Sequence, residues 1–259
     1  MRANAHMRSR LAPWLWVGLL TLCIEGIVRI FHIPEYLFPL PSSVVIEIFD
    51  KAHLILPHLG LTMLEALLGF FLGNLIALTC GILFSQVQSL RQGLLPLFVG
   101  IQAVPIVAIA PFVIIWFGPG ISGKAVLAAL ICYFPATVIS TEGFANVNRD
   151  ALAYLTSIGA SKWKIFWSLR FPSAVPSIVA AFQVSVTLCA IGAIVAELSG
   201  ANQGVGYLIL RASYEFQTRM LFAVMVLTSI ATVGLFFIVK SLGDRYARIY
   251  KFSYAAPVE

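Results

Sequence analysis

The chain has 259 residues, of which 60% are hydrophobic and 11% are charged. A soluble globular domain carries about 25% charged residues, so this composition excludes an ordinary soluble enzyme and is typical of an integral membrane protein. Lys and Arg outnumber Asp and Glu by 17 to 11, which gives a net charge of +6. The basic residues gather at the ends of apolar stretches, which indicates orientation in a bilayer and argues against a nucleic-acid partner.

The apolar stretch from Leu11 to Phe31 predicts the first membrane-spanning helix, because about 20 residues are needed to cross a bilayer. Arg8 and Arg10 precede it as they would in a signal peptide, but no small-x-small cleavage site follows, so we expect an uncleaved helix. Glu25 and Arg29 stand four residues apart and are expected to neutralise one another near its outer end.

Five further apolar stretches predict spanning helices, since a bilayer offers no water to satisfy backbone groups and open strands are excluded. They run over residues 59–84, 93–117, 124–141, 173–198 and 219–242. The sequence therefore predicts an all-α integral membrane protein with six transmembrane helices.

The orientation follows from the basic residues in the connections. With the N-terminus inside, the inner side carries 12 of them: Arg2, Arg8, Arg10, Arg91, Arg149, Lys162, Lys164, Arg170, Lys240, Arg245, Arg248 and Lys251. The outer side carries 4: Lys51, Lys124, Arg211 and Arg219. The positive-inside rule thus predicts that both termini lie in the cytoplasm.

Several polar or small residues stand out within the predicted spans. The GxxxG pair of Gly69 and Gly73 predicts close helix packing. Glu65 and Glu197 are acids of the kind that mark functional sites in membranes, but both lie near span ends, where we expect water to reach them. The loop after Glu197, SGANQG, is expected to be flexible and to form a gate or to meet an external binding protein.

The third span is interrupted by two prolines, Pro105 and Pro111, which free the carbonyl groups of Ile101 and Val107. Broken helices often line a substrate path, while an ordinary kink packed against neighbours is the alternative. Gln102 lies one turn before Pro105 and can offer hydrogen bonds there. The candidate residues of a translocation path are Gln102, Pro105, Pro111, Gln183 and Glu197.

The segment GPGISGKA (118–125) is close to a phosphate-binding Walker A loop. It lacks the Ser or Thr that would hold magnesium, since Ala125 stands there, and it does not follow a strand. We therefore expect a short turn between two spans, with Lys124 marking its edge, and no hydrolysis of ATP by this chain.

A basic, aromatic stretch from Asp150 to Pro176 interrupts the apolar pattern. Asn148 or Asp150 can cap a short amphipathic helix, Gly159 ends or turns it, and a second short helix follows until Pro172 stops it before the fifth span. Two interpretations remain open from these residues: a helix lying on lipid headgroups, or a surface that inserts into a partner.

This stretch resembles the cytoplasmic EAA loop of ABC importer permeases. In that loop a Gly is followed, after nine intervening residues, by aliphatic-x-aliphatic-Pro, and here Gly159 is followed by Leu169-x-Phe171-Pro172. The Glu-Ala-Ala triplet that names the loop is replaced by Ala153-Tyr154-Leu155, so the resemblance implies the docking geometry but puts any contact through that Glu in doubt.

Further segments resemble the permeases that import nitrate, sulfonates, taurine and vitamin precursors. They are FPLPSSVV (38–45), PIVAIAPFVIIWFGPG (105–120) and IVAELSGANQGVGYLI (194–209), and the resemblance covers residues 34–250. It implies a type I ABC importer (MetI-like) permease fold with cytoplasmic coupling helices. The implied division is an N-terminal tail and first helix (1–33), an extracytoplasmic linker (34–57), a permease domain (58–242) with a coupling loop (142–172), and a cytoplasmic tail (243–259).

The resemblance also implies partners in the bacterial inner membrane. Two permease chains, taken as a homodimer, would form the pore above an ATPase dimer that uses ATP and magnesium, and an extracytoplasmic substrate-binding protein would deliver the solute. This chain would itself bind no cofactor or metal. The residues implied in ATPase coupling are Ala151, Leu152, Tyr154, Leu155, Ile158, Gly159, Ala160, Lys162, Trp163 and Pro172.

The substrate is expected to be a vitamin or vitamin precursor of the riboflavin or hydroxymethylpyrimidine type, and otherwise a sulfonate, taurine or nitrate. The alternative function is a proton-coupled secondary transporter. That class requires acids or histidines deep within several spans and usually an internal repeat, and the sequence offers neither. An intramembrane enzyme would need a nucleophile with a base, or metal ligands, at depth, and these are not found either.

Overall fold

The computed structural model describes the backbone of residues 2–254 and the side chains of residues 15–98 and 100–246, and it contains helices without a strand in this range. The all-α prediction is confirmed. In chain order the elements are α1 (Arg2–Ile30), α2 (Pro41–Asp50), α3 (Ala52–Gln86), α4 (Gln88–Gln102), α5 (Ile106–Phe117), α6 (Ile121–Ala145), α7 (Arg149–Ser157), α8 (Lys162–Ile165), the π-helical turn η1 (Phe166–Arg170), α9 (Phe171–Leu198), α10 (Val205–Tyr214) and α11 (Thr218–Tyr254).

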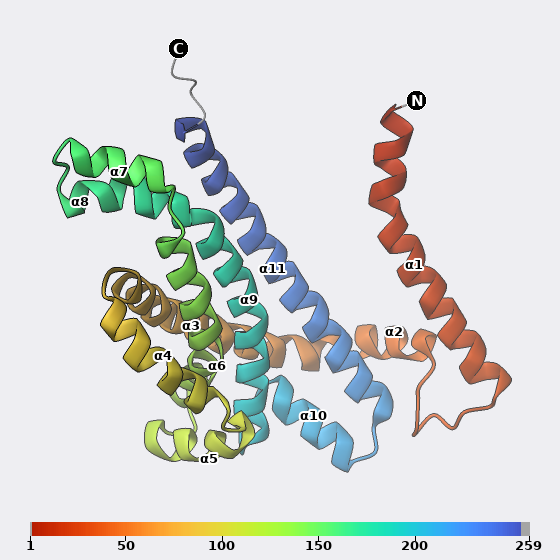
Figure 1. Cartoon of the computed structure of the whole chain (residues 1–259). Coiled ribbons are helices and arrows are strands. Elements are labelled where there is room, and N and C mark those ends of the chain that lie inside the picture. The colour runs from red at the N-terminus through yellow and green to blue at the C-terminus, as the bar shows by residue number, and fades with distance from the viewer. Residues whose placement is uncertain (1, 255–259) are drawn as a thin grey trace.

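The centre of the molecule is formed by α3, α6 and α9, which pack along one another (Figure 1). Small residues allow this close approach. A Cβ atom added at Gly69 of α3 would lie 2.5 Å from the Cβ of Ala128 and 2.8 Å from the carbonyl oxygen of Ala125, both on α6. A Cβ at Gly73 would overlap the sulfur of Cys132. The predicted close packing at this GxxxG pair is therefore confirmed, and its partner is α6.

A buried hydrogen bond also joins α3 to α9. The Asn74 side-chain oxygen accepts a hydrogen bond from the Ser185 hydroxyl at 3.0 Å, and its amide nitrogen donates to the carbonyl of Phe70 at 2.8 Å. Because each group has a partner, Asn74 is accommodated in the apolar interior without an unpaired polar atom.

Four helices of the described part of the chain are long and apolar enough to cross a membrane. They are α3, α6, the continuous helix from Lys162 to Leu198, and α11 from Thr218 to Tyr246; the bent pair of α4 and α5 supplies a fifth if it counts as one span. The first span, predicted over residues 11–31, lies in α1 except for its last residue, because α1 ends at Ile30. The side chains of residues 11–14 and of the preceding arginines lie outside the described part. The count of six stays a prediction.

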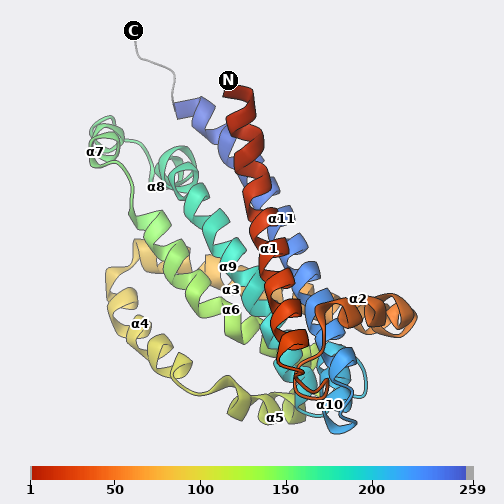
Figure 2. The same ribbon diagram turned by 90° about the vertical axis from the view of Figure 1, so that its right-hand side faces the viewer.

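The third predicted span is broken, as its prolines suggested. The axes of α4 and α5 differ by 96°, and the chain between them ends in Pro105, immediately before α5. Pro111, in contrast, lies inside α5 without ending it. The two helices curve round one side of the central bundle (Figure 2).

The start of α1 and the end of α11 lie toward the same end of the bundle as α7 and α8, whereas α10 and the turn between α5 and α6 lie at the opposite end (Figure 1, Figure 2). This arrangement agrees with an even number of crossings between the termini. The basic side chains predicted for the inner side at positions 2, 8, 10, 248 and 251, and the last five residues of the predicted tail 243–259, lie outside the described residues.

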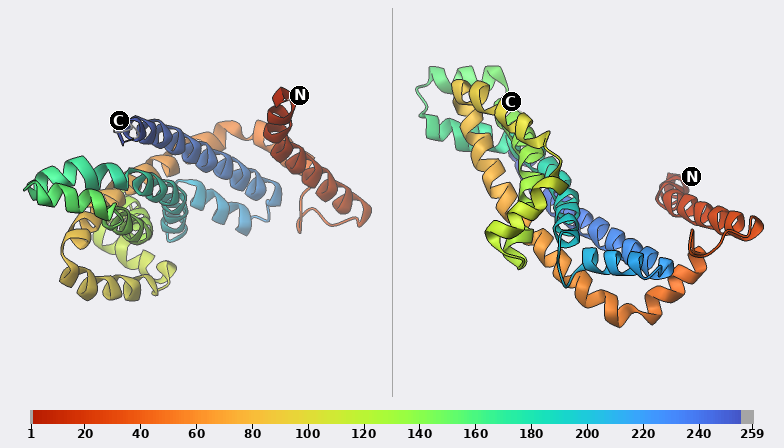
Figure 3. Two further views of the ribbon diagram at one scale, coloured as in Figure 1. Left: turned by 45° about the horizontal axis from the view of Figure 1, so that its top comes forward. Right: turned by 90° about the horizontal axis from the view of Figure 1, so that it is seen from below.

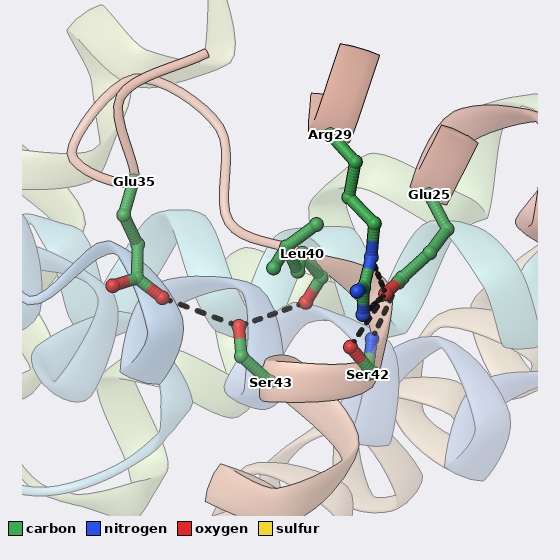
Figure 4. Close-up of polar contacts among 6 residues, drawn as sticks. All are labelled: Glu25, Arg29, Glu35, Leu40, Ser42 and Ser43. Atoms are coloured by element: carbon green, nitrogen blue, oxygen red, sulfur yellow. Dashed lines mark hydrogen bonds and ion pairs between the residues drawn. The ribbon is translucent and has the colours of Figure 1, made fainter. Parts of the chain in front are cut away.

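Helix α1 stands apart from the bundle, and polar contacts near its C-terminal end join it to α2 (Figure 3, Figure 4). Arg29 contacts Glu25 at 2.6 Å, which confirms the predicted ion pair. Glu25 also accepts hydrogen bonds from the backbone nitrogen of Ser42 at 3.0 Å and from its hydroxyl at 2.7 Å. These bonds bind the first turn of α2, which begins at Pro41. Since α2 spans Pro41–Asp50, the predicted linker 34–57 contains a helix.

A second polar contact near the α1–α2 connection joins it to the start of α11. Glu35 accepts a hydrogen bond from the Ser43 hydroxyl at 3.3 Å and forms an ion pair with Arg219 at the start of α11. The hydrogen bond from the Arg219 guanidinium lowers the pKa of the Glu35 carboxyl below its ordinary value. The carboxylate therefore stays ionised under mildly acidic conditions, and this link between the α1–α2 connection and α11 persists there.

Candidate functional site

Helix α7 begins with a side-chain cap. The Asn148 side-chain oxygen accepts hydrogen bonds from the backbone nitrogens of Asp150 at 2.9 Å and Ala151 at 3.0 Å. Of the two predicted caps, the structure selects Asn148, and Asp150 stands in the first turn, where its negative charge complements the helix dipole. A helix of nine residues depends on such a cap, because few intrahelical bonds stabilise it.

Replacing Asn148 with alanine is expected to destabilise α7 locally by about 1 kcal/mol, because two backbone donors lose their acceptor. Amide hydrogen exchange across residues 149–157 should accelerate about fivefold, while exchange in α6 stays unchanged. The matched control is Asn146→Ala, since Asn146 is exposed and its side chain makes no hydrogen bond with the described residues. Equal acceleration in both variants would contradict the assignment of the cap.

Gly159 makes the turn after α7. Its φ angle is +72°, a conformation that residues with a Cβ rarely adopt, and no heavy atom lies within 4 Å of where a Cβ would be. The Ala160 nitrogen donates a hydrogen bond to the Leu155 carbonyl at 3.0 Å, which closes the helix end. Gly159 is thus required by backbone conformation and leaves open space outside the turn.

The predicted stop at Pro172 is wrong. Helices α8, η1 and α9 form one continuous helix from Lys162 to Leu198. Pro172 lies in the first turn of α9, directly after the π-helical turn, in which the Phe171 nitrogen donates to the Phe166 carbonyl five residues earlier. The wider turn changes the hydrogen-bond register just where the proline lacks a donor, so the helix continues through it.

The hairpin of α7 and α8 contains no buried residue among those that the structure describes there. Its side chains include large apolar groups, with Trp163 72%, Tyr154 65% and Ile158 56% exposed. Of the residues predicted for coupling, Tyr154, Ile158, Gly159, Lys162 and Trp163 are exposed, and Ala151, Leu152, Leu155, Ala160 and Pro172 are partly buried. An apolar surface of this kind on an exposed hairpin is typical of a docking element.

The base of the hairpin is an aromatic cluster that the sequence analysis did not identify. The ring of Trp167 lies 5.6 Å from that of Trp163, 5.3 Å from that of Phe166 and 5.2 Å from that of Phe171, between ring centroids. Phe166 in turn stacks on Phe144 near the end of α6 at 5.9 Å. These contacts hold the start of the continuous helix against α6.

The break between α4 and α5 borders a hollow of about 410 Å³. Residues 101–106 and Ile109 line one side, and Leu130, Ile131, Tyr133 and Phe134 of α6 line the other. The structure therefore brings Gln102 and Pro105 together at one site, with two aromatic residues that sequence reasoning missed. Pro111, Gln183 and Glu197 are not among its lining residues, and no lining residue is charged.

The expectation that water reaches Glu65 and Glu197 is wrong, because both are 0% exposed. Lys124, expected to mark the edge of a turn, is also buried, and its ammonium group contacts a Glu65 oxygen at 2.8 Å. One Glu197 oxygen accepts a hydrogen bond from the Thr62 hydroxyl at 2.6 Å, and the other accepts one from the Gly206 nitrogen at 2.6 Å. We call Thr62, Glu65, Lys124, Glu197 and Gly206 the charged cluster. It joins α3, α6, α9 and α10.

The glycine-rich segment after α9 is fitted around Glu197. Gly204 has φ +108°, and a Cβ atom there would overlap the Glu197 carboxylate. A Cβ at Gly206 would lie 2.7 Å from the Cβ of Glu197 and 2.7 Å from the carbonyl oxygen of Ile194. The Gly204 nitrogen also donates to the Nδ1 atom of His58 at 2.8 Å. The part of this segment that adjoins α10 is therefore held in place, contrary to the expected flexibility.

Of the segment 118–125, residues 118–120 form the predicted turn between α5 and α6, and the rest belongs to α6. Gly118 has φ +85° and ends α5, and α6 begins at Ile121. No strand precedes the turn in the described part of the chain, and Lys124 is engaged with Glu65, so the segment does not have the structural setting of a phosphate-binding loop.

Comparisons with known proteins agree on one class. The family described as "Binding-protein-dependent transport system inner membrane component" matches residues 69–250. A probable ABC transporter permease protein of Haemophilus influenzae is 33% identical and covers 91% of this chain and 96% of its own length. The formylaminopyrimidine transport permease protein ThiX of Halalkalibacterium halodurans is 30% identical and covers 90% of this chain and 93% of its own length.

Two further similarities agree with this class. The riboflavin transport system permease protein RibX of Chloroflexus aurantiacus is 28% identical over 84% of this chain and 82% of its own length. Among solved structures, an inward-facing form of the MetNI methionine ABC transporter has a chain with a TM-score of 0.63 at 17% identity, covering 78% of this chain and 98% of that one, which supports the fold.

The apolar helices, the exposed hairpin and these similarities favour neither a secondary transporter nor an enzyme, since the related permeases are non-catalytic transport components. The chain belongs to the family of inner membrane components of binding-protein-dependent transport systems, and it is a multi-pass permease subunit of an ABC importer.

Proposed function

We propose that this chain forms the translocation path for a small, uncharged heterocyclic solute, delivered by an external binding protein and driven by a separate ATPase subunit. The observation that carries the coupling part is the α7–α8 hairpin, which presents exposed Tyr154, Ile158 and Trp163 and has no buried residue of its own. Binding of ATP and magnesium belongs to the ATPase partner in this proposal, and a second copy of the chain completes the pore.

The hairpin would transmit ATPase movement to the membrane helices through its covalent connection. Residues 151–163 would fit a cleft of the ATPase, with Ile158 and Trp163 as the apolar contacts and Lys162 facing acidic groups. Closure of the ATPase dimer then displaces the hairpin, and the continuous helix from Lys162 to Leu198 carries this displacement as a rigid-body movement between inward-facing and outward-facing states. In this proposal the hairpin and both termini lie in the cytoplasm, which the distribution of basic residues supports.

The hollow at the α4–α5 break supports the substrate class. Its lining offers the amide of Gln102, the phenol of Tyr133 and the ring of Phe134, together with apolar groups, and no cation. A sulfonate or nitrate in such a hollow would leave its negative charge without a partner, which is costly away from water. A neutral heterocycle can stack on the aromatic rings and exchange hydrogen bonds with Gln102.

Uptake assays with radiolabelled solutes in a strain deleted for this gene test the substrate class. We expect loss of uptake of a pyrimidine precursor or riboflavin, restored by the wild-type gene, with taurine and nitrate uptake unchanged. Loss of taurine or nitrate uptake alone would contradict the neutral-solute proposal and leave the coupling proposal intact.

Introducing a charge at the hairpin turn tests the coupling proposal. Aspartate and asparagine both tolerate the positive φ of Gly159 better than other residues with a Cβ, so Gly159→Asp and Gly159→Asn differ chiefly in charge. We expect Gly159→Asn to retain the ATPase subunit during purification from native membranes in mild detergent. Gly159→Asp should lose it at least about tenfold, because an acid would face the acidic groups opposite Lys162.

Mass spectrometry of the co-purifying chains gives the measurement, with equal amounts of permease loaded for each variant. If wild type and both variants retain the same chains in the same ratio, the hairpin does not dock on the ATPase, and the interpretation as a helix lying on lipid headgroups is the correct one.

A further inference from the structure

The charged cluster contains more acid than base. Its ionisable members are Glu65, Glu197 and Lys124, and no other Lys, Arg or His nitrogen of the described residues lies within 4.0 Å of either carboxyl group. His58 lies beside the cluster and accepts a hydrogen bond at Nδ1, so its ring is neutral, and it stacks on Tyr207 of α10 with ring centroids 5.8 Å apart. With both acids ionised, the cluster would carry one uncompensated negative charge.

One oxygen in this cluster has no partner. Lys124 donates to the Oε1 atom of Glu65, while the Oε2 atom of the same carboxyl is buried and has no hydrogen bond within the described structure. Glu197 reaches the same face of α3, because its hydrogen-bond partner Thr62 lies three residues before Glu65 on that helix, and both acids are 0% exposed. Two ionised carboxylates can only accept hydrogen bonds, so as neighbours in this buried site they would repel each other unless a proton lies between them.

We propose that Glu65 and Glu197 share one buried proton, and that this proton fastens α10 and the glycine segment to the central bundle. Because the Lys124 ammonium group contacts Glu65 at 2.8 Å, we assign the proton to Glu197, which donates its O–H group to the Oε2 atom of Glu65. The proton supplies the missing hydrogen bond and makes the cluster electrically neutral. It thereby removes the cost of an unpaired charge in a site from which water is excluded.

The consequence for the fold is specific to α10. Glu197 accepts the backbone hydrogen bond of Gly206, and the Thr62 hydroxyl that binds Glu197 also accepts the bond from the Val205 nitrogen at 2.8 Å. Both donors belong to the first turn of α10. With the proton on Glu197, the first turn of α10 binds a neutral cluster. Without it, the same turn binds a site that holds two ionised carboxylates.

Infrared spectroscopy of the purified full-length protein in neutral buffer tests the proposal directly. We expect a protonated-carboxyl band that is sensitive to deuterium exchange, disappears in Glu197→Gln and persists in Glu215→Gln. Glu215 is a matched control because it is an exposed acid paired with Arg211 on the surface. A folded wild-type protein without a protonated-carboxyl band would overturn the proposal.

Thermal unfolding of the same variants gives a second, independent test. Glutamine at position 197 keeps a donor toward Glu65 and an acceptor for Thr62 or Gly206, so Glu197→Gln should melt close to the wild type. Glu65→Gln leaves the Lys124 ammonium buried without a counter-ion and should unfold at a clearly lower temperature. Glu197→Gln that is as unstable as Glu65→Gln would mean that both acids are ionised and would contradict the shared proton.

Discussion

Gly69→Ala is expected to destabilise the helix bundle by about 1–3 kcal/mol, although alanine is the better helix former of the two residues. The added methyl group would meet the Cβ of Ala128 at 2.5 Å and the carbonyl oxygen of Ala125 at 2.8 Å. Neither atom can rotate away, since one is a methyl fixed to the backbone and the other is the backbone itself. Helices α3 and α6 must separate, and the contacts along their whole shared length weaken.

The matched control is Gly60→Ala on the same helix. No heavy atom lies within 4 Å of a Cβ placed at Gly60, so only the helix propensity changes, and stability should stay constant or rise by up to about 1 kcal/mol. Melting of the detergent-purified proteins, followed by the loss of monodisperse protein on heating, gives the comparison. Equal melting temperatures for the two variants would contradict the proposed contact between α3 and α6.

Lys124→Met is expected to destabilise the protein by about 3–5 kcal/mol, the range found when one partner of a buried ion pair is removed. Methionine matches the length and apolar stem of lysine, so packing is largely kept. The loss comes from Glu65, which is 0% exposed and would lose its counter-ion in a site without access to water. This effect is electrostatic and requires no movement of the backbone.

A second substitution separates charge from packing. The double variant Lys124→Met with Glu65→Gln removes both charges of the pair, and we expect it to be more stable than Lys124→Met alone. Lys51→Met serves as the control, because Lys51 is exposed and forms no ion pair among the described residues, and its effect should stay within about 0.5 kcal/mol. A double variant that is less stable than either single variant would show that the lysine acts through packing.

The local features of this fold were accessible from the sequence because each depends on a few neighbouring residues. The Asn148 side chain caps α7 by binding backbone nitrogens only two and three residues further along the chain. Gly159 adopts a turn conformation that its lack of a Cβ permits. The Gly69–Gly73 pair predicted close packing without naming the partner helix. The break at Pro105 followed from the missing amide hydrogen.

Two of the features that sequence reasoning missed depend on contacts between different helices. The position of Glu197 near the end of a span suggested contact with water, but α10 folds back over it and supplies the Gly206 nitrogen. Lys124 looked like the edge of a turn because its partner, Glu65, stands on another helix. Pro172 suggested a stop because a π-helical turn has no recognisable signature in one sequence.

The continuous helix from Lys162 to Leu198 joins the two ends of the molecule mechanically. Its 37 residues extend over about 55 Å at 1.5 Å per residue. Trp163 stands at its exposed end and Glu197 at its buried end, so under the proposed coupling a displacement of the hairpin would also move the charged cluster. A tilt of this one helix would then link events at the two faces of the membrane, without a relay of separate contacts between them.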